Sequence, residues 1–270
     1  MKILIVSGFL GAGKTTFIKR LARNVDQRFA ILENEYGAAG IDGARLGQNR
    51  QGTQKNVWEM TEQCICCIGK KDFAASVLTI ANVVDPEYLI VEPTGVGSLA
   101  RIIENLRQIE YERIQLLSPV TIVDVYSYRR YMAEYPELYQ DQIRSADTII
   151  VSKTEACQAE EKQRIQKFLQ EINPQAKIIT DYASTMTRED YQSLLLGGRY
   201  EKEVQDTQSG EKMPETFSFE NIRMEAPETL WCFLEQIIRG AFGNIIRAKG
   251  QFAAGDQFLQ FDVADHRYSI

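Results

Sequence analysis

Short apolar runs recur along the first two thirds of the chain, and helical spacing of apolar residues follows most of them. The runs are rich in Val, Ile and Leu, which is typical of strands buried on both faces of a sheet. Strands are predicted over residues 2–6, 28–32, 88–91, 120–123, 148–151 and 176–179. Helices are predicted after the first strand from residue 16, over 70–83 and 98–109, between the strands at 120–123 and 148–151, and over 158–171 and 187–195. This alternation predicts an α/β fold, with a mostly parallel sheet covered by helices on both faces.

The pattern changes after residue 196. Residues 197–215 contain Gly-Gly, Ser-Gly, several charges and a proline, which is typical of a linker. Beyond it, a strand, a helix and two strands are predicted over 216–224, 227–240, 245–252 and 257–263. We therefore expect a first domain over 1–196, a linker over 197–215, and a small α+β domain over 216–270.

A glycine-rich stretch lies between the first predicted strand and helix. Residues 8–16 read GFLGAGKTT and fit G-x-x-x-x-G-K-[ST]. Backbone N–H groups and a helix N-terminus would there surround a chain of phosphates. Lys14 would reach the β- and γ-phosphates, and the Thr15 hydroxyl would ligate Mg²⁺. A chance Lys-Thr in a glycine turn is the alternative; the flanking elements favour a P-loop NTPase.

Carboxylates follow two of the predicted strands. Glu92 ends one of them, at the place where P-loop folds hold Mg²⁺, and Thr94-Gly95 can offer an N–H to the γ-phosphate. Glu33 and Glu35 lie at another strand end and can serve Mg²⁺ or a second metal. The alternatives are a surface carboxylate for Glu92 and a solvated acidic turn for Glu33 and Glu35.

The turn Ser152-Lys153-Thr154-Glu155 follows a late strand, where GTPases place Asn-Lys-x-Asp. A carboxylate there accepts two hydrogen bonds from guanine that adenine does not offer, and a lysine packs along the base. Glu replaces Asp and Ser replaces Asn in this chain, so the match is partial. A charged strand-to-helix turn is the alternative.

Three of the five cysteines crowd into four positions: Cys64, Cys66 and Cys67. Three thiolates can bind Zn²⁺, Cu⁺ or Co²⁺ and leave a coordination position open, which suits handing the ion on. Redox chemistry and inert packing are the alternatives. The single histidine, His266, argues against histidine-based catalysis.

The composition of the chain excludes some classes of binding partner. The net charge of −6 argues against a nucleic-acid surface. No signal-peptide pattern or membrane-length apolar run is visible, so we expect a cytoplasmic protein that does not bind membranes.

These motifs together resemble the CobW-type P-loop GTPases, relatives of the nickel-chaperone GTPases that serve urease and hydrogenase. GFLGAGKTT followed by ENEYG and then CICC is the most specific part. Further matching stretches run along the chain: GIDG at 40–43, EPTG at 92–95, VD at 123–124, QIRSAD at 142–147, NPQA at 173–176 and IIRAKG at 245–250.

The resemblance implies a GTPase that cycles between GTP and GDP, binds Zn²⁺ or a related ion such as Co²⁺, and delivers it to a client metalloprotein. The implied catalytic residues are Lys14, Thr15 and Glu92, and Mg²⁺ would be held by Thr15 with Glu92 or Glu35. Transported metal would bind Cys64, Cys66 and Cys67. The implied nucleotide-binding residues are Gly11, Ala12, Gly13, Lys14, Thr15, Thr16, Gly95, Ser152, Lys153 and Glu155.

Three departures from the family pattern stand out. Ala38 replaces an acidic residue, a histidine-rich stretch is absent, and the C-terminal part is short. Two other functions stay open at this stage: a regulatory module switched by nucleotide, and an ATP-dependent kinase of a small molecule. A homodimer is a further alternative to a single chain.

Overall fold

A computed structural model describes residues 1–27, 29–35, 58–63, 70–204, 214, 215, 217, 219, 222, 226–254, 257–264 and 266–270. Its centre is an eight-stranded sheet of order β3-β2-β4-β1-β6-β7-β8, with the short β5 also paired to β1, and every pair is parallel. The strands are β1 (Lys2–Gly8), β2 (Phe29–Glu35), β3 (Trp58–Gln63), β4 (Tyr88–Glu92), β5 (Gln115–Leu116), β6 (Val120–Asp124), β7 (Thr148–Ser152) and β8 (Lys177–Ile179).

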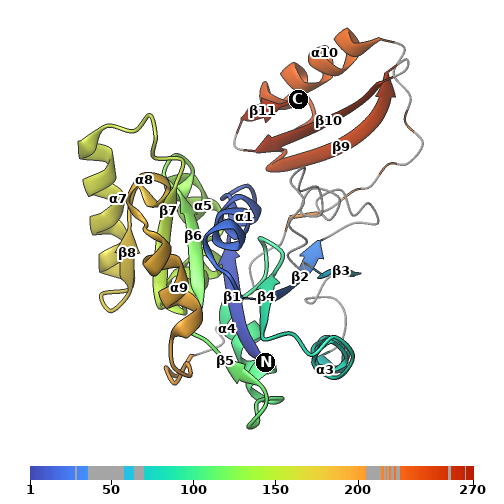
Figure 1. Ribbon diagram of the computed structural model, residues 1–270. Coiled ribbons are helices and arrows are strands. Elements are labelled where there is room, and N and C mark those ends of the chain that lie inside the picture. The colour runs from blue at the N-terminus through green and yellow to red at the C-terminus, as the bar shows by residue number, and fades with distance from the viewer. Residues whose placement is uncertain are drawn as a thin grey trace.

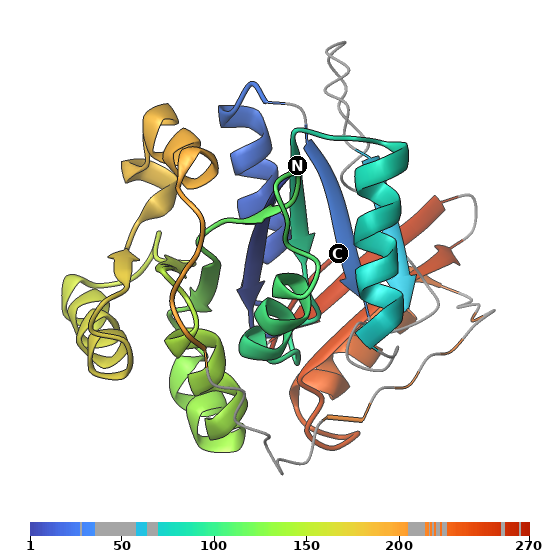
Figure 2. The same cartoon turned by 90° about the horizontal axis from the view of Figure 1, so that it is seen from below.

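Helices cover both faces of this sheet, as Figures 1 and 2 show. On one face Leu4 and Val6 share an apolar cluster with residues of α1 (Lys14–Asn24), α8 (Tyr182–Thr185) and α9 (Arg188–Leu196). Ile3 and Ile5 lie on the other face, which is covered by α3 (Lys70–Val83), α4 (Leu99–Arg107), α5 (Tyr128–Glu134), α6 (Pro136–Arg144) and α7 (Ala159–Ile172). The predicted α/β architecture is confirmed.

A smaller unit follows the large one. It contains α10 (Pro227–Ile238) and an antiparallel sheet of order β11-β10-β9, made of β9 (Arg247–Ala254), β10 (Gln257–Ala264) and β11 (Arg267–Ser269). Leu230, Leu234 and Ile237 of α10 pack against Phe261 and Val263 of β10. In Figure 1 this sheet lies beyond the carboxyl ends of the parallel strands, with α10 on its far side.

Several elements differ from the sequence-based expectation. β2 continues through Glu35, because its pairing with β3 carries on as far as Glu35 and Gln63, where an acidic turn is predicted. β3, β5, α8 and β11 are not among the predicted elements. The predicted strand over 216–224 lies mostly outside the described residues, and Phe217, Phe219 and Ile222 are not in a strand.

The start of the predicted linker contacts the large unit. The Tyr200 side chain is 3% exposed, packs in the apolar core, and donates a hydrogen bond of 2.9 Å to the Ser145 carbonyl. The Arg107 guanidinium donates to the Lys202 carbonyl at 2.5 Å. The division of the chain into two domains and a linker stays a prediction. None of the described helices combines the length and the apolar character needed to cross a membrane.

Asn173, the first residue of the NPQA motif at 173–176, binds the chain at the end of α6. Its side-chain amide lies 2.8 Å from the Ile143 carbonyl, 3.3 Å from that of Arg144 and 2.9 Å from that of Ala146, and the residue is 3% exposed. The amide therefore adds a buried donor to the carbonyl groups at and just after the end of α6, where the Ile143 carbonyl also accepts from the Ala146 N–H and the Arg144 carbonyl from Lys202 Nζ. In this way the NPQA turn after α7 fixes the end of α6.

We predict that Asn173→Ala lowers the free energy of unfolding by about 2 kcal/mol, because it removes a buried amide that donates to the carbonyls of Ile143 and Ala146 at 2.8 Å and 2.9 Å. Urea denaturation followed by circular dichroism measures the change. Gln175→Ala, at an exposed position of the same turn, is the matched control. Equal midpoints for the two variants would contradict this role of Asn173.

Candidate functional site

The glycine-rich loop joins β1 to α1 at the carboxyl edge of the sheet. Gly13 precedes the helix with φ of 99°, a left-handed conformation that glycine adopts without strain. The Lys14 side chain is 5% exposed, and its Nζ donates to the carbonyls of Gly8 at 3.0 Å and Phe9 at 3.3 Å. The loop therefore holds a cation beside the N-terminus of α1, a combination that attracts phosphate.

The Thr15 hydroxyl meets the carboxylate of Glu92 across the strand ends. Its Oγ1 lies 3.0 Å from one Glu92 oxygen and 3.2 Å from the other. Glu33 of β2 is in register with Glu92 of β4, so the two carboxylates lie side by side. Hydroxyl and carboxylate oxygens are the donors that Mg²⁺ prefers. This part of the site fits a hard divalent cation.

The two acidic residues of β2 differ from the expected acidic turn. Glu33 is 3% exposed and belongs to a strand between β3 and β4, so the solvated-turn alternative is wrong for it. Glu35 is the last residue of the strand. Its role as a Mg²⁺ ligand stays a prediction.

The turn after β4 lies directly against the phosphate loop. A methyl group at Gly95 would approach the Leu10 nitrogen to 2.5 Å and its Cα to 2.8 Å, so only glycine allows this contact. From the other side, the Gln142 amide of α6 donates to the carbonyls of Gly95 and Gly97, at 3.0 Å each. Thr94, predicted to sense the γ-phosphate together with Gly95, is buried beside them.

The turn after β7 is tied to the same loop. The Ser152 hydroxyl donates to the Ala12 carbonyl at 2.6 Å. Lys153 has a left-handed φ of 61°, uncommon for a side chain of its size, and its Nζ lies 2.5 Å from Asp124 Oδ2 of β6. The Glu155 side chain is exposed. Ser152 thus anchors the turn, while Asp124 orients Lys153.

Asp181, in the turn after β8, braces the same region. It accepts a hydrogen bond of 2.6 Å from Lys162 of α7, and the neighbouring Thr154 also lowers the pKa of its carboxyl. The bond from Lys162 holds the pKa of the Asp181 carboxyl below its ordinary value, against the opposing effect of burial. The carboxylate is therefore charged at neutral pH and links α7 to the turn that contains Lys153.

The cysteines fall in different parts of the chain. Cys64, Cys66 and Cys67 lie outside the described residues, so their predicted metal site is untested by the structure. Burial raises the pKa of the Cys157 thiol, which makes it a poor nucleophile, and Cys232 is exposed on α10. Within the described ranges, no three His, Cys, Asp or Glu side chains are grouped as metal ligands.

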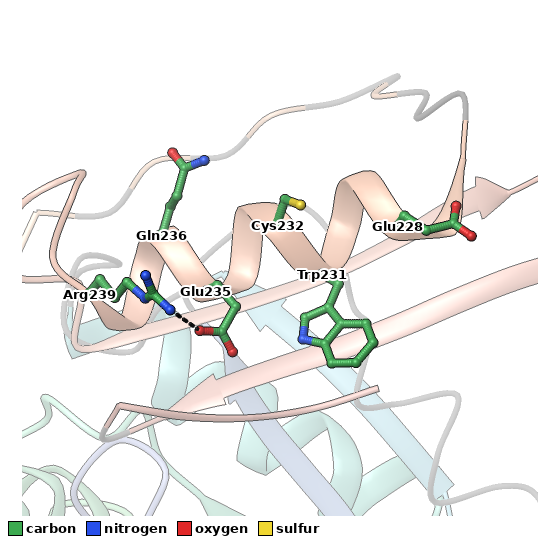
Figure 3. Close-up of a pocket in the computed structure, with 6 residues that line it drawn as sticks. All are labelled: Glu228, Trp231, Cys232, Glu235, Gln236 and Arg239. Atoms are coloured by element: carbon green, nitrogen blue, oxygen red, sulfur yellow. Dashed lines mark hydrogen bonds and ion pairs between the residues drawn. The ribbon is translucent and has the colours of Figure 1, made fainter.

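A shallow hollow lies on the outer side of α10, away from these groups (Figure 3). Its side chains do not converge on one point, and the Arg239 guanidinium is paired with Glu235 at 3.4 Å. The hollow therefore lacks the convergent polar groups of a binding site. It is lined by Glu228, Trp231, Cys232, Glu235, Gln236 and Arg239.

Three polar residues of the site were not assigned roles from the sequence. Asp124 and Gln142 belong to stretches that match the family pattern, and this match is the sequence feature that could have pointed to them. Asp181 carried none, because its contacts come from α7 and from the turn after β7.

A phosphate loop between a central strand and a helix, with an acidic residue ending the neighbouring strand, defines a P-loop nucleotide-binding domain. The family model described as the CobW/HypB/UreG nucleotide-binding domain matches residues 2–180. The chain belongs to this family.

Two relatives in Escherichia coli K12 are named zinc chaperones. YeiR is 30% identical over 178 residues, covering 65% of this chain and 53% of that protein, and YjiA is 27% identical over 186 residues, covering 66% and 56%. The chain spans about half the length of the curated relatives it matches. The crystal structure of Zn(II)-bound YjiA GTPase shares the fold, with a TM-score of 0.55, 20% identity, and coverage of 100% of this chain and 87% of that one.

We predict that Gly95→Ala destabilises the site, because the added methyl group would press on the Leu10 backbone. Overpacking of this kind costs about 1–3 kcal/mol. The free energy of unfolding in urea measures the change. Gly198→Ala is the matched control, since a methyl group there meets no atom within 4 Å. If Gly95→Ala is no less stable than Gly198→Ala, the contact is not as tight as described.

Proposed function

We propose that the chain is a GTP-hydrolysing metallochaperone, which binds Zn²⁺ at Cys64, Cys66 and Cys67 and passes it to a client metalloprotein. The observation that supports nucleotide binding is the contact of Thr15 with Glu92. The Thr15 hydroxyl oxygen lies 3.0 Å and 3.2 Å from the two carboxylate oxygens of Glu92. This pair lies beside Lys14, at the N-terminus of α1. A hydroxyl, a carboxylate and a lysine in this arrangement support binding of a nucleotide triphosphate with its metal ion.

Each group of the loop has a role in phosphoryl transfer. The backbone N–H groups of residues 11–16 bind phosphate oxygens, and Lys14 stabilises the charge that develops on the β- and γ-phosphates. Thr15 and Glu92 would hold Mg²⁺, with Glu33 beside Glu92 in the neighbouring strand. Mg²⁺ bound there would supply positive charge that offsets the negative charge of the phosphates.

Guanine is the proposed base. Lys153 would pack along its plane, and its salt bridge with Asp124 supports this by fixing the direction of the long side chain. The exposed Glu155 carboxylate would accept the hydrogen bonds that distinguish guanine from adenine. The Ser152 bond to Ala12 supports the same assignment, since it joins the base-reading turn to the phosphate loop.

Two observations support the proposed metal binding: the three cysteines within four positions of the sequence, and the names of the relatives. Several relatives carry names that refer to zinc, among them YeiR and, in Dictyostelium discoideum, a zinc-regulated GTPase metalloprotein activator. The cysteines lie in the chain between β3 and α3, and β3 pairs with β2, which contains Glu33. A change at the γ-phosphate can therefore reach the thiols through two neighbouring strands.

We predict that Lys14→Ala lowers kcat for GTP hydrolysis about 100-fold or more, because a buried cation is lost where charge develops. Phosphate release from GTP in the presence of Mg²⁺ measures the rate. Lys167→Ala, at an exposed position of α7, is the control and should hydrolyse GTP like the wild type. Wild-type turnover by Lys14→Ala, or the absence of GTP hydrolysis by the wild type, would contradict the proposed activity.

We also predict that Zn²⁺ affinity differs about tenfold between the state with a non-hydrolysable GTP analogue and the GDP state, as in other linked equilibria. Competition with a chromogenic chelator measures the affinity. The double variant Cys66→Ser, Cys67→Ser should lose the tight site, whereas Cys232→Ser should keep it. Equal Zn²⁺ affinity in both nucleotide states would contradict a coupling between the cysteine site and the bound nucleotide.

A further inference from the structure

The small C-terminal sheet touches the phosphate loop. A methyl group at Gly11 would come within 2.5 Å of the Ala264 Cβ, so the last residue of β10 is in direct contact with the loop. Ile246, just before β9, is buried in the same apolar cluster as Phe9 and Val96. Figure 1 shows the sheet facing this edge of the large unit, with α10 turned away from it.

Two arginines flank this contact. Ala264 pairs directly with Arg247 of β9 and with Arg267 of β11, so the three residues form one row across the sheet. Directly paired residues in antiparallel strands share a face. Phe261 and Val263 face α10, and because side chains alternate along a strand, the row of Ala264 is on the face that meets the loop.

This face is positively charged in a chain whose net charge is −6. Lys249 pairs with Asp262 in the next row, so the described residues of β9, β10 and β11 place three cations and one carboxylate on this face. The arginines are also held in place. Arg247 is paired with Asp262 at 3.2 Å, and the Arg267 guanidinium lies 4.2 Å from the centre of the Tyr126 ring.

The contacts of Arg267 with Tyr126 and of Ala264 with Gly11 show how the row of Arg267, Ala264 and Arg247 lies over the large sheet. Tyr126 follows β6, and its N–H donates to Asp124, the residue that holds Lys153. Ala264 lies at the loop after β1, which is the next strand of the sheet. Arg247 is paired to Ala264 on the side opposite Arg267. With Arg267 beside the end of β6 and Ala264 beside the loop after β1, the order of the row directs Arg247 toward β4, the strand of Glu92.

We propose that Arg247 and Arg267 bind the phosphates of the nucleotide, with Arg247 on the γ-phosphate side. The C-terminal sheet is then a cationic cap on the phosphate loop. This inference rests on the proposed nucleotide site. The guanidinium suits the task because its N–H groups match phosphate oxygens in pairs. The cap also makes the position of the C-terminal unit depend on the bound nucleotide.

The test is equilibrium binding of fluorescent GDP and of a fluorescent non-hydrolysable GTP analogue to the full chain with Mg²⁺. We expect Arg247→Ala to weaken the GTP analogue about tenfold or more, with a smaller effect on GDP. Arg267→Ala should weaken both nucleotides. Arg239→Ala is the matched control: this arginine belongs to the same unit, lies on α10, and has a 78% exposed side chain.

Each other outcome has a distinct meaning. Unaltered binding by Arg247→Ala and Arg267→Ala, with a wild type that binds both nucleotides, overturns the cap and leaves the proposed function standing. Tighter binding by the two variants overturns the cap as well, since the sheet would then be an obstacle to the nucleotide. A wild type that binds neither nucleotide overturns the proposed function and this inference together. Circular dichroism of each variant confirms that the comparison is made between folded chains.

Discussion

The hydrogen bond from Thr15 to Glu92 joins the two strands on which the site depends. Thr15 belongs to the first turn of α1, which the phosphate loop joins to β1, and Glu92 ends β4. β1 and β4 are parallel neighbours with Ile5 opposite Val91, so their carboxyl ends come out at the same edge of the sheet. The central residues of both strands are fully buried, which prevents one strand from sliding past the other. A side chain of ordinary length then suffices to connect them, and the core holds the connection in place.

The phosphate loop is touched on both sides, by the turn that follows β4 and by the last residue of β7. Gly95, after β4, lies against Leu10, and Ser152, at the end of β7, donates to the Ala12 carbonyl. Gln142 holds the first of these turns from α6. Because these contacts are tight, the loop cannot adjust to a different number of phosphates by itself. In the proposed function, a change at the γ-phosphate would be passed to the turn after β4, which is the physical link that a nucleotide switch requires.

Much of the fold could be predicted because the central strands are buried on both faces and their residues are almost all apolar. β3 reads Trp-Glu-Met-Thr-Glu-Gln and lacks this signature, since it is an edge strand held by its pairing with β2. Glu33 was expected in a turn for the same reason: its burial comes from strands on either side, which a local pattern does not contain. The loop, Glu92 and the turn at 152–155 are continuous motifs and could be predicted. The roles of Gln142 and Asp181 depend on contacts between distant segments.

In the C-terminal unit, α10 covers one face of the antiparallel sheet and forms the apolar core with it. The other face of the sheet carries charged side chains. Among the described residues, five buried apolar side chains from α10 and β10 form that core, with partly buried ones packed against them, so it is small. The unit also buries Ile246 in an apolar cluster of the large unit. The contacting face is positive, and the loop that it meets holds the Lys14 cation. Bringing positive groups together is unfavourable, and a bound triphosphate reverses the sign of that interaction. Docking of the unit and binding of the nucleotide must then favour each other by the same free energy. A small unit of marginal stability is well suited to this, since a modest electrostatic change is enough to shift its position.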